Sequence, residues 1–172
     1  ISSVRKALQI KFGKAWWNNP QAKESIKQAA TPSVLYDLYI NTLHGWYNKN
    51  FKPEIKIHGV IHLSGGAFNE KLAKDLLFPK KLSAEINNLW EPPKIMKECA
   101  KWRRLTDKEF YEAWNGGQGM LLVVNKEDAV YCIKRAKDFG IRAKITGKIT
   151  KEKIPQVMIS SQLNKGKKII YK

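Results

Sequence analysis

The chain has 172 residues, 43% of them hydrophobic and 10% aromatic, which predicts one folded domain and excludes an intrinsically disordered chain. Its 32 Lys and Arg against 15 Asp and Glu give a net charge of +17, which admits nucleic acid, an anionic membrane surface or phosphorylated small molecules as partners. No apolar run approaches the ~20 residues that a membrane span needs, and no segment resembles a signal peptide. The chain begins with Ile1, so we expect a fragment or a processed chain.

Apolar residues at helical spacing, together with capping residues, predict the helices. Their expected ranges are 2–12, 21–30, 32–47, 69–77, 93–102, 107–114 and 126–139. Three local signals indicate where helices begin: Thr31 before a proline, Asn125 as an N-cap, and a capping box that joins Thr106 to Glu109.

Alternating or continuous apolar segments predict the strands. These are expected at 54–64, 82–89, 120–124, 141–149, 157–161 and 168–171, the last two forming a hairpin around residues 164–166. Strands that alternate with helices and end in a hairpin indicate an α+β or α/β domain, with a β-sheet covered by helices.

Two cysteines, Cys99 and Cys132, lie in predicted helices without metal-binding or redox spacing, so we expect reduced thiols in a cytoplasmic protein.

Only five of the 32 cationic residues are arginine, and the lysines are spread along the chain, a pattern typical of a solvated surface. The six tryptophans lie beside prolines or on apolar helix faces and are expected in the core. A nucleic-acid-binding module is therefore the second interpretation; it predicts affinity that falls steeply with salt.

The stretch 58–69 leads a strand into Gly65 and Gly66 and then into a helix. Glycines allow backbone N–H groups to approach a ligand, and a helix N-terminus favours anions. The alternative is a tight turn without a ligand. A second glycine-rich loop, 115–119, precedes the strand at 120–124, and its alternative is likewise a turn, with Asn115 as a cap.

His58 and His62 are four residues apart on a strand, so both side chains lie on one face. A metal site is the minority interpretation, because no third ligand is evident. We expect a structural, hydrogen-bonded His58, whereas His62, next to the glycines, is the better candidate for ligand contact.

Three ordered segments resemble the C-terminal domain of aminoimidazole ribonucleotide synthetase, also called phosphoribosylformylglycinamidine cyclo-ligase. They are Ile-Ser-Ser-Val-Arg-Lys at 1–6, His-Leu-Ser-Gly-Gly-Ala-Phe at 62–68, and Glu-Phe-Tyr-Glu-Ala-Trp-Asn-Gly-Gly-Gln-Gly-Met at 109–120. Ala67 replaces a glycine of the family, so we expect no positive φ there, and Glu112 replaces its usual arginine. The resemblance covers roughly residues 1–150; the extension 150–172 matches poorly.

The resemblance implies an α+β fold with a mixed β-sheet and helices in three layers, partly ferredoxin-like, in a single domain at 1–172. It implies ATP-dependent closure of formylglycinamidine ribonucleotide to aminoimidazole ribonucleotide in purine biosynthesis. It begins midway along the family's chain, so ATP and Mg²⁺ are expected mainly on an absent N-terminal domain, the full-length protein as a homodimer, and this fragment alone as inactive.

The expected substrate-binding residues are His62, Ser64, Gly65, Gly66, Asn115 and Gly117. No catalytic residue is assigned. Sister ATP-dependent enzymes are the nearer alternatives: selenophosphate synthetase, formylglycinamidine ribonucleotide synthetase and hydrogenase maturation factors.

Overall fold

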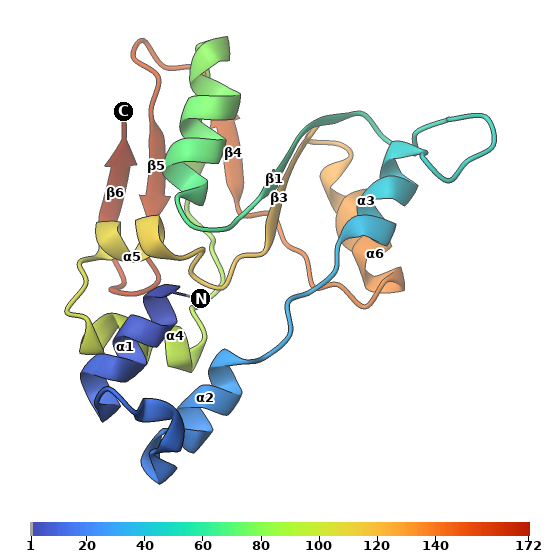
Figure 1. The fold of residues 1–172 in the computed structure, drawn as a ribbon. Helices are drawn as coiled ribbons and strands as arrows, with labels where there is room; N and C mark the ends of the chain where they lie inside the picture. Colours follow the sequence, from blue (N-terminus) through green and yellow to red (C-terminus); the bar gives the residue numbers. More distant parts are fainter. Residues whose placement is uncertain (1) are drawn as a thin grey trace.

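The computed structural model describes residues 2–172 and confirms an α+β fold (Figure 1). The α-helices are α1 (Ser2–Phe12), α2 (Lys23–Ala29), α3 (Asp37–His44), α4 (Lys94–Trp102), α5 (Asp107–Ala113) and α6 (Ala129–Asp138). The strands are β1 (Ile57–His62), β2 (Ser83–Ile86), β3 (Met120–Val124), β4 (Gly147–Thr150), β5 (Val157–Ser160) and β6 (Lys168–Tyr171). A wide π-helix, η3 (Ala67–Leu77), and the short 3₁₀ turns η1 (Trp16–Asn18), η2 (Pro20–Ala22) and η4 (Phe78–Lys80) complete the elements.

The strands divide between two sheets. Four form a mixed sheet in the order β4-β2-β5-β6, in which β2 and β5 are parallel and the outer pairs are antiparallel. The predicted C-terminal hairpin is present as β5 and β6. The other two strands, β1 and β3, form a separate antiparallel pair that lies between this sheet and helices α3 and α6 in Figure 1.

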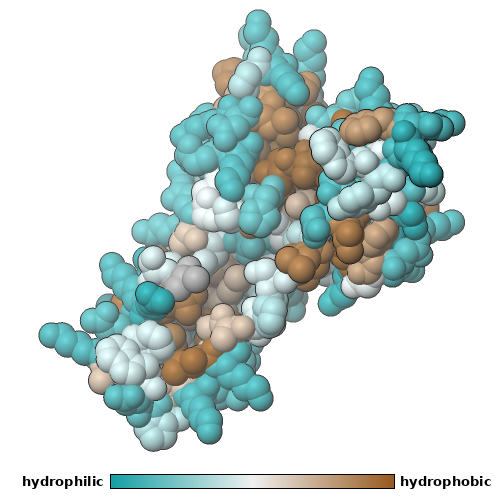
Figure 2. Space-filling view, turned by 45° about the vertical axis from the view of Figure 1, so that its right-hand side comes forward, coloured by the Kyte–Doolittle hydropathy of each residue, from teal (hydrophilic) through white to brown (hydrophobic). Residues whose placement is uncertain are grey.

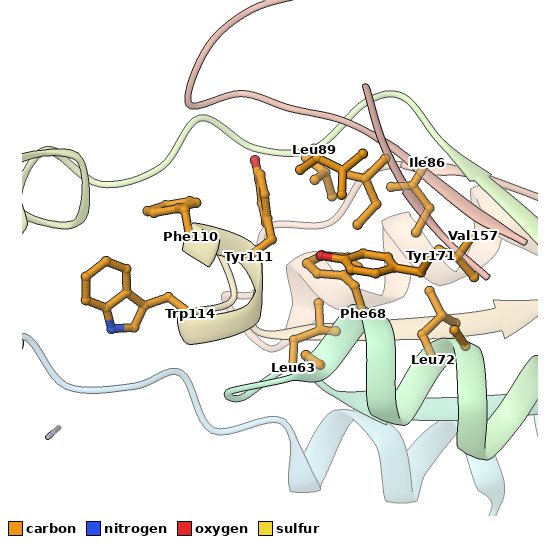
Figure 3. Packing of buried hydrophobic residues seen from close by; sticks show 14 of the residues in the cluster. Leu63, Phe68, Leu72, Ile86, Leu89, Phe110, Tyr111, Trp114, Val157 and Tyr171 are labelled. Carbon is orange, nitrogen blue, oxygen red and sulfur yellow. The ribbon is translucent and has the colours of Figure 1, made fainter. Parts of the chain in front are cut away.

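The larger core lies where η3 and α5 pack against the four-stranded sheet. Phe68 of η3 and Tyr111 of α5 are fully buried, and their rings meet edge to face at 5.7 Å. Figure 3 shows them beside Val157 of β5 and Tyr171 of β6. Helices α1 and α4 pack against each other below this core in Figure 1. Because Phe68 and other residues of η3 are buried in the core, the core holds η3 and the glycine loop that precedes it in place.

A smaller core joins α3 and α6 to the β1–β3 pair. Tyr39 and Leu43 of α3 pack with Cys132 and Ala136 of α6, and the Tyr39 hydroxyl donates a 2.9 Å hydrogen bond to the Cys132 carbonyl. Burial raises the pKa of Tyr39, so it stays protonated as that donor. Cys99 and Cys132 are buried free thiols in helices, as expected.

Helix α3 is shorter than the predicted 32–47. The Thr31 hydroxyl donates to the Gln28 carbonyl at the end of α2, at 2.9 Å, instead of capping the next helix. At the other end Gly45 adopts φ +80° and stops the helix. Trp46 therefore lies beyond the helix, is 59% exposed, and packs on Phe51 with ring centroids 5.2 Å apart.

The expectation that the tryptophans lie in the core is wrong for four of the six: Trp16 and Trp90 are half-buried and belong to neither core, and two others are exposed. Trp46 is exposed, as described above, and Trp17 is 61% exposed because it lies in the short turn η1, where it contacts Trp16. Trp114 is buried as expected. No helix among residues 2–172 is long and apolar enough to cross a membrane.

Two further boundaries differ from the predictions, one because of a distant contact and one because of a local turn. The predicted strand 141–149 is regular only over β4, because the preceding residues bond to 87–89: the backbone N–H groups of Asn87 and Asn88 both donate to the Thr146 carbonyl. The predicted helix 126–139 begins at Ala129, after a turn in which Asn125 bonds to Asp128.

Candidate functional site

The two predicted glycine loops meet at one end of the β1–β3 pair. Antiparallel pairing places His62 opposite Met120, so the loop that follows β1 and the loop that precedes β3 leave the same end. The pairing continues one step further, because the Leu63 N–H donates to the Gly119 carbonyl at 3.0 Å. Segments that are 50 residues apart in sequence thus form one surface.

Asn115 joins the two loops through its side chain. Its Nδ2 donates to the Leu63 carbonyl at 3.0 Å, and its Oδ1 accepts from the Gly117 N–H at 2.9 Å. A third bond runs from the Gly66 N–H to the Glu112 carbonyl, at 2.8 Å. Both ends of the Asn115 amide are engaged with backbone, which is more than a cap on the preceding helix.

The glycine conformations explain the need for glycine at two positions. Gly66 has φ +70° and is the N-cap of η3, without a side-chain capping bond. Gly117 has φ +87° and is exposed. Ala67, which replaces a family glycine, is buried inside η3 and outside the left-handed region, as expected. The N–H groups of Gly66, Ala67 and Gly117 are already bonded, to the Glu112 carbonyl, the Ser64 carbonyl and Asn115 Oδ1. The start of η3 therefore offers the partial positive charge of a helix N-terminus beside exposed glycines.

Lys71 is a site residue that sequence reasoning missed. Its ammonium donates to Ser64 Oγ at 2.6 Å and to the His62 carbonyl at 3.3 Å, so it holds a positive charge against the first glycine loop. The available signal was a lysine within the first turns of the helix that follows the glycines, because that part of the helix folds back over the strand end.

The two histidines have different surroundings. His58 Nε2 lies 2.9 Å from Asn125 Oδ1, which confirms its structural, hydrogen-bonded role. The His62 side chain is exposed at the end of β1, next to the loop. Within residues 2–172 no three His, Cys, Asp or Glu side chains are grouped to hold a metal ion, so the metal interpretation gains no third ligand.

A groove of about 1210 Å³ runs from the second glycine loop between the two sheets. It is lined by β3, by parts of β2 and β4, and by residues 140–149, and in Figure 2 hydrophobic residues gather in the hollow between the two upper lobes. Of the six predicted substrate residues Gly117 lines this groove, and the other five lie outside its lining.

Buried Gln118 fixes the second loop to the segment at Trp90. Its Nε2 donates to the Trp90 carbonyl, and its Oε1 accepts from the Trp90 N–H, both at 2.9 Å. The Trp90 ring has two cations close to it: Arg142 Cζ lies 4.5 Å and Lys144 Nζ 4.1 Å from the ring centroid. Burial and the charge of Arg142 lower the pKa of Lys144. The groove is therefore cationic at this end.

Comparison with known families gives a match over residues 44–160 to the AIR synthase related protein, C-terminal domain. The chain belongs to this family. Both glycine loops, Gln118 and the Trp90 segment lie within the matched residues of the AIR synthase related domain, whereas α1, α2 and β6 lie outside them.

Curated relatives of this AIR synthase related domain carry the name phosphoribosylformylglycinamidine cyclo-ligase. The protein of Caldanaerobacter subterraneus subsp. tengcongensis is 31% identical over 120 residues, which are 69% of this chain and 32% of that protein. The Pseudothermotoga lettingae protein is 28% identical over 150 residues, 87% of this chain and 41% of the relative. That of Methanocaldococcus jannaschii is 33% identical over 97 residues, 56% and 26% respectively. The matches thus span between about a quarter and two fifths of these relatives' lengths.

Proposed function

We propose that this chain is the C-terminal domain of an ATP-dependent cyclo-ligase that converts formylglycinamidine ribonucleotide to aminoimidazole ribonucleotide. The observation that carries the proposal is the joining of the two glycine loops by Asn115 at the end of the β1–β3 pair, within the residues matched by the family. The reaction is proposed from the name that the curated relatives share, phosphoribosylformylglycinamidine cyclo-ligase.

In the proposed reaction the formyl oxygen is phosphorylated by ATP, and the amidine nitrogen then attacks that carbon and displaces phosphate. ADP and phosphate leave as the imidazole ring closes. Such chemistry requires two phosphorylated molecules held in line and an activated intermediate shielded from water. The positive end of η3 and the fixed Lys71 suit this task, because they stabilise negative charge without rearranging.

We assign substrate contact to residues of both loops. The set is His62, Ser64, Gly65, Gly66, Asn115 and Gly117, to which we add Lys71. Asn115 retains one amide hydrogen and one lone pair after its two backbone bonds, so it can still donate to or accept from an amide-like substrate. The Lys71 ammonium next to Ser64 would stabilise a phosphate or an oxyanion at the first loop.

ATP and Mg²⁺ are proposed to bind mainly to the remainder of the full-length protein. Among the residues described, no three carboxylate, histidine or cysteine side chains are grouped to hold a metal ion by themselves. We further propose that the full-length protein is a cytoplasmic homodimer.

The test is ADP formation by the full-length protein, with and without formylglycinamidine ribonucleotide. We expect ADP release that depends on the ribonucleotide, and K71M to reduce it by about tenfold or more through loss of one charge-assisted contact. The matched control is K153M, an exposed lysine in the loop between β4 and β5. If the rate of ADP release does not depend on this ribonucleotide but increases with selenide or glutamine, the chain belongs to a sister enzyme instead.

A further inference from the structure

A second cationic centre surrounds Trp90. Beside the ring lies a cavity of about 310 Å³ that adjoins the larger groove: it shares Trp90 and residues 140–143 with the groove lining and adds Lys137. Lys144 approaches the same ring from the groove side. Two positive charges therefore lie against one aromatic side chain, and a third, that of Lys137, lines the cavity beside it.

The parts of this cluster are held in place by other bonds. Lys144 Nζ donates to Asn88 Oδ1 at 3.0 Å and to the Leu89 carbonyl at 3.1 Å. The Trp90 backbone is fixed by both ends of the Gln118 amide. Lys144 and the Trp90 backbone are thus positioned before any ligand arrives, which lowers the entropy cost of binding.

The positive charge of the cluster is not neutralised by carboxylates. In the part of the chain that the structure describes, the ion pairs involve other cations, and the neighbouring Glu91 is paired with Lys97 at 2.8 Å. The C-terminus of α6 accounts for Lys137, which lies in its last turn, because a helix C-terminus favours a cation. It does not account for Arg142 and Lys144, which lie beyond the helix against Trp90.

We propose that the cavity beside Trp90 binds the phosphate group of a phosphorylated small molecule. A guanidinium offers a planar fork to two phosphate oxygens, and an ammonium adds a point charge. The identity of the molecule that carries this phosphate rests on the proposed function. The Gln118 bonds place it directly beside the second glycine loop, so one ligand can reach both.

The geometry favours a small phosphate over a nucleic acid. Single-stranded nucleic acid binds by stacking bases on free aromatic faces along an extended groove. Here Arg142 and Lys144 already lie within 4.5 Å of the Trp90 ring centroid, and Arg142 lines one small cavity together with Lys137.

The test is an NMR titration of the chain with inorganic phosphate at constant ionic strength. The Trp90 indole N–H signal is identified as the one that W90F lacks. We expect a saturable shift of this signal, a Kd raised by about tenfold or more in R142Q and in K144Q, and a Kd within about twofold of the parent value in K153Q. R142K, which keeps the charge but not the fork, is expected to lie between R142Q and the parent chain.

Equal phosphate affinity in the parent chain, R142Q and K144Q would overturn the proposal. So would binding of a short single-stranded oligonucleotide that is weakened by R142Q when inorganic phosphate causes no Trp90 shift; that result would assign the cluster to nucleic acid. Circular dichroism establishes which variants fold, and R142K with K144Q carries the test if R142Q does not. The titration involves no turnover, so loss of ribonucleotide-dependent ADP release with phosphate binding intact would reject the proposed function and leave this site standing.

Discussion

The bridge that Asn115 makes between the loops leads to a sharp prediction for the substitution N115D. The new carboxylate has nearly the same shape and still accepts from the Gly117 N–H, but it places an oxygen where Nδ2 now donates to the Leu63 carbonyl. One hydrogen bond is lost, and two acceptors face each other. The variant therefore removes the link between loops and keeps the turn within the second loop.

A lost hydrogen bond that leaves a partly buried acceptor unpaired costs about 1–3 kcal/mol. For a chain of this length, about 2 kcal/mol corresponds to a decrease in Tm of about 4–8 °C. Thermal unfolding followed by circular dichroism measures this decrease. The chain carries +17, so the long-range effect of an added negative charge favours folding and does not account for a lower Tm.

The matched control is N48D. Asn48 also accepts from the N–H two residues ahead, at 3.2 Å from Asn50, but lies in an exposed turn. We expect N48D to change stability by less than about 0.5 kcal/mol. Equal Tm values for N115D and N48D would refute the conclusion that the Asn115 side chain holds the loops together.

Three further predictions concern the scaffold. G147A is expected to lower Tm by several degrees, because a methyl group there would collide with the backbone of β2 and such overpacking costs about 1–3 kcal/mol; an unchanged Tm would contradict this. Burial opposes ionisation of Asp107, but hydrogen bonds from Ser161 and Asn164 outweigh it and lower its pKa, so its stabilisation is complete above pH ~4 and is lost as the pH falls through the lower folded pKa. Urea unfolding between pH 7 and 2 should show a weaker acid dependence in D107N than in the parent chain, and equal dependence would count against this account. T106A removes the cap of α5 and should lower the free energy of unfolding, measured in urea, by about 1 kcal/mol. T106S keeps a hydroxyl at this position and should retain most of that stability.

Features set by neighbouring residues were predictable from the sequence. The capping box between Thr106 and Glu109 is present at the start of α5, and β3 has its predicted bounds. The C-terminal hairpin and the α+β class are confirmed as well. In each case a side chain satisfies a backbone group within three residues, or apolar alternation selects a strand, so no distant contact is needed.

Boundaries and contacts that depend on distant partners, or on a choice between two nearby ones, were not predictable. Thr31 had two helix ends within reach and bonds to the earlier one. Asn125 was predicted to cap a helix, but its Oδ1 lies 2.9 Å from Nε2 of His58, which is 67 residues away in sequence. A rule for local helix caps does not predict this contact. Lys71 becomes part of the site only because η3 folds back over the end of β1. The glycine loops themselves were recognisable, but their joining through Asn115 depends on the antiparallel register of β1 and β3.

The amide of Gln118 acts as a substitute peptide group. By donating to and accepting from the same residue, Trp90, it reproduces the exchange between a hydrogen-bonded pair of an antiparallel ladder without a strand being present. Glutamate lacks the donor, and asparagine is one methylene shorter, so neither can make both bonds at this spacing. The second glycine loop, Trp90 and the two cations against its ring are thus coupled at one end of the groove through a single side chain.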